Sequence, residues 1–129
     1  MTKIFFETDD DYAAGCGAFD VPAPALTTAV ATATLAAAFA APYTVKPVYG
    51  GCARIYVDLS LPGHASKVAV AKAAKALGLV YGPNYYSKCK TSLYIGYDNA
   101  TGREYAKGVA VAAALAAAGW SASADGYGD

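Results

Sequence analysis

The middle of the chain concentrates tyrosines and basic residues, which recognise other molecules by stacking and by charge. Tyrosines on a sheet face with cations beside them bind single-stranded nucleic acids, because the rings stack on bases and the cations neutralise phosphates. Tyrosine is also enriched at protein interfaces and in strands of any function. A nucleic-acid or nucleotide ligand, a protein partner and a purely structural role all stay open. The candidate nucleic-acid contacts are Arg54, Tyr56, Tyr94, Tyr97, Arg103 and Lys107.

Two segments are suited to contact a protein partner: the tyrosine-rich loop 81–90 and the acidic loop 7–11. In such an interface, tyrosines fill pockets of the partner and charges surround them. The acidic loop lacks the alternating ligands, central glycine and closing glutamate of a calcium-binding loop, so we expect a solvated turn or a partner-binding edge there and no metal site. The candidate partner contacts are Tyr81, Tyr85, Tyr86, Lys88, Lys90, Glu7, Asp9, Asp10 and Asp11.

His64 is the single histidine and carries the enzymatic alternative. With Asp58 and a nearby serine or cysteine it could form a nucleophile, base and acid set. No nucleophile-elbow motif accompanies these residues, and the start of a helix disfavours a protonated histidine. We therefore expect no catalytic residue and no enzymatic activity, with a small enzyme that uses His64 and nearby carboxylates as an alternative.

The sequence also lacks the spacings that hold metals and nucleotides. Cys16, Cys52 and Cys89 are far apart and form no CxxC pair, which argues against a disulfide framework or a zinc site. The glycines at 15–17 and 50–51 fit neither of the common phosphate-binding loops. We expect no cofactor.

Composition indicates one ordered domain over residues 1–129. Hydrophobic residues make up 56% of the chain and charged residues 16%, below the roughly 25% of an average domain. Met1 and Lys3 lead directly into a strand-like run with no signal peptide, so we expect a cytoplasmic protein. An acidic segment over 1–21 precedes a basic segment over 43–107. This distribution suits two complementary parts of one surface, or a basic patch that binds a polyanion.

The chain reads as three loose strand–helix–strand units, at 1–49, 50–87 and 88–129. Each begins with a β-prone run that mixes aromatic and aliphatic residues. These runs are 3–7, 54–58 and 92–98, and the shorter second runs are 43–49, 79–86 and 120–124. Helices are predicted at 23–41, 65–77 and 102–118, with glycines 78 and 119 after the last two.

We predict an α+β sandwich with a ferredoxin-like β-α-β-β-α-β core, an extra N-terminal strand and helix, and one sheet with helices packed mainly on one face. The four residues 93–96 are similar to the start of the RNP2 strand of RNA-recognition motifs. Tyr97 and Asp98 depart from that motif and no RNP1 strand accompanies it, so the similarity indicates no family. The sequence leaves open whether Tyr56 and Tyr94 face the helices or solvent.

The first predicted helix is unusual because no charged residue lies between Val21 and Val45. A surface helix normally has a polar face. The segment is rich in alanine and threonine and is bounded by prolines, so we predict no membrane span. We expect instead that helix 23–41 is covered on two sides and forms part of a homo-oligomer interface.

Taken together, these features favour a small non-catalytic binding protein that acts by occluding a partner through a protein–protein surface. Compact chains without motifs are often inhibitors or adaptors, including those carried by mobile elements; this step is an analogy. Nucleic-acid or nucleotide binding through a basic, tyrosine-rich sheet face is the alternative.

Overall fold

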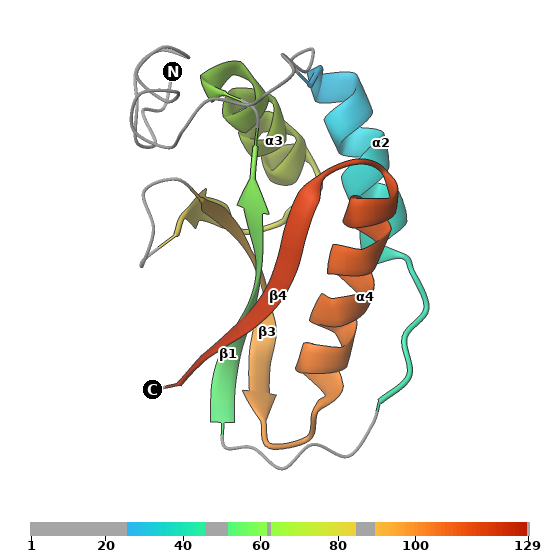
Figure 1. Ribbon diagram of the computed structural model, residues 1–129, viewed down its shortest axis with the longest axis vertical. Coiled ribbons are helices and arrows are strands. Elements are labelled where there is room, and N and C mark those ends of the chain that lie inside the picture. The colour runs from blue at the N-terminus through green and yellow to red at the C-terminus, as the bar shows by residue number, and fades with distance from the viewer. Residues whose placement is uncertain (1–25, 46–51, 62, 85–89, 129) are drawn as a thin grey trace.

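The computed structural model describes residues 26–45, 52–61, 63–84 and 90–128 (Figure 1). These residues form an α+β arrangement of one four-stranded antiparallel sheet and three helices. The elements are α2 (Thr28–Phe39), β1 (Cys52–Ser60), α3 (His64–Ala76), β2 (Tyr81–Pro83), β3 (Thr91–Asn99), α4 (Arg103–Ala117) and β4 (Ser121–Gly128). The prediction of an α+β chain built on a single sheet is confirmed for this part of the molecule.

The strands lie in the order β2-β3-β1-β4, so that β1 and β3 are central. Tyr56 of β1 stands opposite Tyr94 of β3 and Asp125 of β4, and Asp58 stands opposite Ser92 and Ser123. A bulge in β3 shifts this register between Ile55 and Tyr56. Because directly opposed residues point to the same face of a sheet, this register decides which side chains meet.

The two faces of the sheet differ in chemistry. Ile55, Val57 and Leu59 of β1 point toward the core and are buried. Tyr56 and Asp58 point to the opposite face, because side chains alternate along a strand. The same alternation in β4 puts small alanines toward the core and polar residues away from it. Tyr56 and Tyr94 therefore lie on the face opposite the core, which the sequence left undecided.

The helices cover the core face. Helix α4 packs on β4, β1 and β3, while α3 contacts β2 and α2 packs against both α3 and α4 (Figure 1). The core joins Val57, Leu59 and Leu93 of the sheet to Leu35 of α2 and Leu115 of α4. At Gly108 a β-carbon would stand 2.9 Å from the Ile55 side chain, so glycine permits α4 to approach the sheet closely.

Helices α3 and α4 end as predicted. Gly78 and Gly119, with φ of 72° and 92°, follow their last turns in the left-handed conformation that favours glycine. The observed bounds differ from the predicted 65–77 and 102–118 by one residue at each end. Such shifts are ordinary, because the ends of helices are defined only to within one or two residues.

Lys67 of α3 is buried. Its side chain is only 1% exposed, although lysine is among the residues that are most often exposed. It stands three residues before the buried Val70 and seven before the buried Ala74, so all three share one helical face. Burial lowers the pKa of Lys67 to about 8, because the charged form is poorly solvated there.

Helix α2 is shorter than the predicted 23–41. Thr27 caps its start, with its hydroxyl accepting a hydrogen bond from the Val30 N–H. Its buried face of Ala31, Leu35 and Ala38 meets the neighbouring helices. Two helices, α3 and α4, thus cover part of its surface, and Val30 on another side is 53% exposed. No helix among the described residues is both long and apolar enough to cross a membrane.

The predicted strands are confirmed in part. The runs at 54–58 and 92–98 are the central strands β1 and β3, and the run at 120–124 extends to Gly128 as β4. Of the run at 79–86, the described residues 79–84 contain β2 at Tyr81–Pro83, and residues 85–86 lie outside the described part. Residues 43–45 form no strand. The predicted strand at 3–7 and residues 46–49 lie outside the described residues.

The start of helix α4 is capped by Asp98, which lies near the end of β3. The Asp98 carboxylate accepts hydrogen bonds from the backbone N–H groups of Thr101, Gly102 and Tyr105 at 2.8, 2.9 and 3.1 Å. Gly102 holds the cap position and provides no side chain. Burial acts to raise the pKa of the Asp98 carboxyl, but the hydrogen bonds outweigh it and the pKa is lowered.

We predict that Asp98→Ala lowers the free energy of unfolding by about 1 to 3 kcal/mol, because buried N–H groups lose their acceptor. Since the folded-state pKa lies below the unfolded value, the stabilisation from Asp98 is present above the unfolded pKa and is lost as pH falls through the folded one. Chemical denaturation at neutral and acidic pH measures both effects. The matched control is Arg103→Ala, an exposed position in the same turn, with a change within about 0.5 kcal/mol. Equal losses in the two variants contradict the capping role.

Candidate functional site

The face of the sheet opposite the helices gathers aromatic and polar side chains from all four strands and their ends. We call it the tyrosine–aspartate face. Its members follow from the strand register, in which directly opposed residues share a face. They are Arg54, Tyr56 and Asp58 of β1, Ser92, Tyr94 and Tyr97 of β3, Ser123, Asp125 and Tyr127 of β4, and Asn84 after β2.

Three tyrosine rings lie in contact at its centre. The Tyr56 ring centroid is 5.3 Å from that of Tyr94 and 5.5 Å from that of Tyr127, at interplanar angles of 60° and 56°. Tilted packing at this separation is favourable because the edge of one ring meets the face of the next. The rings are half-buried, so the array is held in place and still offers ring surface.

The Asp58 carboxylate accepts hydrogen bonds from three polar side chains of this face. Its Oδ1 accepts hydrogen bonds from Asn84 Nδ2 at 2.9 Å and Ser92 Oγ at 2.8 Å, and its Oδ2 accepts one from the Tyr127 hydroxyl at 2.7 Å. Asn84 Nδ2 also donates to Ser92 Oγ at 3.0 Å. Asp58 is 4% exposed, and these donors offset the cost of burying its charge.

A second carboxylate stands beside the first. The pKa of the exposed Asp125 carboxyl is raised, first by its hydrogen bond with Asp58, then by burial and by the repulsion of the Asp58 charge. Lys90 acts in the opposite direction with the smallest contribution. The hydrogen bond, the burial and the neighbouring negative charge all favour the protonated form of Asp125.

The same two carboxylates act on the Tyr127 hydroxyl. Burial and the hydrogen bond to Asp58 raise the pKa of its hydroxyl to about 12, with a small opposite effect from Asn84. The hydroxyl therefore stays protonated and donates to Asp58 throughout the physiological range.

This arrangement suits recognition. It offers fixed aromatic surface, a satisfied carboxylate and one exposed carboxylate of raised pKa. No set of three histidine, cysteine, aspartate or glutamate side chains with the geometry of a metal site occurs among the described residues. The free Cys52 lies at the start of β1, where its thiol donates to Asn99 Oδ1 at 3.0 Å.

The fold divides the predicted nucleic-acid contacts into two groups. Arg54, Tyr56, Tyr94 and Tyr97 share the tyrosine–aspartate face. Arg103 and Lys107 belong to α4, which packs on the other side of the sheet. Lys107 Nζ lies 5.8 Å from the centre of the Phe39 ring of α2, so it is engaged within the helical layer.

The predicted partner contacts are only partly described. Tyr81 faces the core side, packs against the core and donates its hydroxyl to Thr91 Oγ1 at 2.9 Å. Lys90 is exposed and acts on Asp125. Tyr85, Tyr86 and Lys88 lie outside the described residues, as do Glu7, Asp9, Asp10 and Asp11. His64 of the enzymatic alternative is buried as the first residue of α3.

Sequence reasoning missed most of the polar network. Asn84, Ser92, Asp125 and Tyr127 were not candidate residues, and Asp58 was named only as a partner of His64. The alternation of β1 was a usable signal, because it puts Asp58 on the face of Tyr56. The pairing that brings Asp125 and Tyr127 to that face was not readable from one sequence.

No protein-family model matches this chain, and neither the curated proteins nor the solved structures contain a match to it.

Proposed function

We propose that the chain is a small non-catalytic binding protein, of inhibitor or adaptor type, that uses the tyrosine–aspartate face to occlude a protein partner. The observation that carries the proposal is the packed array of Tyr56, Tyr94 and Tyr127 on the face that no described helix covers. Rigid tyrosines offer large contact area at a low entropic cost, and such residues dominate binding energy at interfaces.

The arrangement of charges favours a protein over a polyanion. Asp58 and Asp125 stand beside the rings, where they repel phosphates. Arg103 and Lys107 were expected to neutralise phosphates, but α4 holds them on the other side of the sheet. The cations of the face itself are Arg54 and, beside Asp125, Lys90.

Single-stranded nucleic acid is the second candidate, and one observation favours it. Tyr56 and Tyr94 occupy the two central strands and touch each other, with Arg54 and the exposed Tyr97 beyond them. Aromatic pairs on central strands are the stacking platform of RNA-recognition motifs. As part of the same proposal we class β1–α3–β2–β3–α4–β4 as ferredoxin-like; the order of the elements and the antiparallel sheet support this class.

The test compares wild-type chain with Tyr94→Ser and with Tyr105→Ser as baits in a cell lysate treated with nuclease. Tyr105 is 40% exposed on α4, away from the tyrosine–aspartate face, so its variant is the matched control. We expect specific proteins on the wild-type and Tyr105→Ser baits and their loss from the Tyr94→Ser bait. Equal retention by all three baits contradicts binding through this face.

A salt titration with a labelled single strand separates the two candidates. Binding driven by phosphate contacts weakens steeply between low and physiological salt. The protein-partner proposal expects no binding of the strand even at low salt. Salt-sensitive binding that Tyr94→Ser abolishes would establish the nucleic-acid alternative instead.

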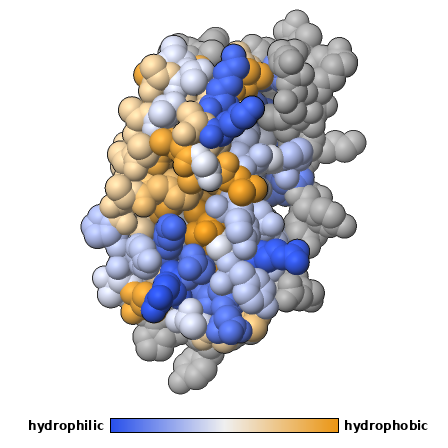
Figure 2. Space-filling model, turned by 180° about the vertical axis from the view of Figure 1, so that it is seen from behind, coloured by the Kyte–Doolittle hydropathy of each residue, from blue (hydrophilic) through white to orange (hydrophobic). Residues whose placement is uncertain are grey.

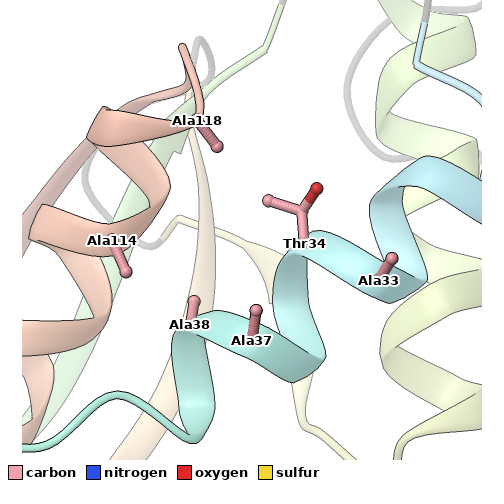
Figure 3. Close-up of a pocket in the computed structure, with 6 residues that line it drawn as sticks. All are labelled: Ala33, Thr34, Ala37, Ala38, Ala114 and Ala118. Carbon is pink, nitrogen blue, oxygen red and sulfur yellow. The ribbon is translucent and has the colours of Figure 1, made fainter.

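We also propose self-association through the segment 23–41, whose described part is α2. An uncharged surface spans α2 and α4, and it encloses a shallow hollow of about 370 Å³. Figure 2 shows this apolar surface, and Figure 3 shows small side chains reaching into the hollow from both helices. Its lining is Ala33, Thr34, Ala37, Ala38, Ala114 and Ala118. The absence of charge favours contact with an identical surface, since nothing there repels a second copy.

Sedimentation of the purified chain tests self-association. We expect the wild type to sediment as an oligomer and Ala37→Glu to sediment as a monomer, because the variant buries an unpaired charge in the contact. Lys72→Glu introduces the same side chain at an exposed position of α3, away from the hollow, and is the matched control. We expect it to sediment as the wild type does. A monomeric wild type at high concentration contradicts the proposal.

A further inference from the structure

We propose that the tyrosine–aspartate face recognises an arginine side chain of its partner, with the guanidinium group over the tyrosine rings and against the Asp125 carboxylate. This inference rests on the proposed function and adds the chemistry of the group that is bound. The structure supplies three elements of such a site: ring faces, an exposed carboxylate and a buried carboxylate that fixes the geometry.

The two carboxylates of the site repel each other. Asp58 receives hydrogen bonds from one amide and two hydroxyls, besides the one that it shares with Asp125. Asp125 feels the repulsion of Asp58 more strongly than the attraction of Lys90. A cation from a partner would therefore favour the ionised form of Asp125.

The tyrosine rings select the kind of cation. A cation over a tyrosine face is attracted by the negative face of the ring. Guanidinium is planar and weakly hydrated, so it stacks on aromatic rings while its N–H groups bind a carboxylate. The contact between Tyr56 and both Tyr94 and Tyr127 holds the rings in place before binding. A lysine ammonium matches this combination less well, because it is a compact and strongly hydrated charge.

A divalent cation fits less well. Hard cations take six or more oxygen ligands, and the described residues of the face offer two carboxylates. One of these, Asp58, already accepts hydrogen bonds at both oxygens. Asp125 is the carboxylate that remains exposed to a partner.

Binding is expected to depend on pH through Asp125. The groups around it are Asp58 and Arg54 of β1, Tyr127 of β4, Tyr94 of β3 and Lys90 before β3. Protonation of Asp125 removes the charge that the guanidinium group needs. Affinity should therefore fall as pH is lowered through the raised pKa of Asp125.

The experiment titrates the whole chain with Nα-acetylarginine amide while backbone NMR signals are followed. Nα-acetylcitrulline amide, which has the same shape without the charge, is the matched ligand. We expect arginine-specific shifts at residues 56, 94 and 125, and about fivefold weaker binding to Asp125→Asn, from the loss of one exposed ion pair. Glu104→Gln also removes one carboxylate charge, but from α4 on the other side of the sheet, and it should bind as the wild type does.

Two outcomes overturn the inference: equal shifts with the arginine and citrulline probes, or unchanged binding to Asp125→Asn. These results leave the proposed function intact if the lysate experiment still shows proteins lost with Tyr94→Ser. Arginine-specific shifts together with no protein lost from that bait would instead contradict the proposed function while the arginine site stands. The two failures are therefore distinguishable.

Discussion

The described sheet and its outer face depend most on the carboxylate of Asp58. It lies on a central strand, is almost fully buried, and accepts hydrogen bonds from Asn84, Ser92 and Tyr127. Those three donors follow β2 or belong to β3 and β4, so one side chain ties together all four strands of the described sheet. A buried carboxylate without such donors is strongly destabilising. The buried carboxylate therefore requires the strand register that brings these three donors to it.

The same register separates the two faces of the sheet. Alternation along β1 sends Val57 and Leu59 into the helical layer and turns Tyr56 and Asp58 outward. The inner face supplies the free energy of folding through apolar burial. The outer face does not have to bury apolar side chains, so it can hold the tyrosines and carboxylates that we propose as partner contacts. The small residue Gly108 lets α4 close over the inner face.

The sequence predicted what is local. The apolar and glycine patterns of α3 and α4 located both helices, and the aromatic runs located β1 and β3. It did not predict the network, because Asp58 and Tyr127 meet only once the pairing of β1 with β4 is known. The same holds for the helix cap, where Asp98 reaches back from the end of β3. It also holds for Lys107, which the α4 packing carries away from the tyrosines.

The Asp58 network is tested most directly by the ionisation of the Tyr127 hydroxyl, followed by NMR of carbon-labelled tyrosine, with Tyr127→Phe to assign the signal. We predict a pKa of about 12 in the wild type and a value nearer the ordinary tyrosine value of about 10 in Asp58→Asn. Because the folded-state pKa is raised, the stabilisation from this hydroxyl is present below the unfolded pKa and is lost as pH rises toward the folded one. A wild-type Tyr127 that titrates near the ordinary value, unchanged by Asp58→Asn, would contradict the network on which the face is built.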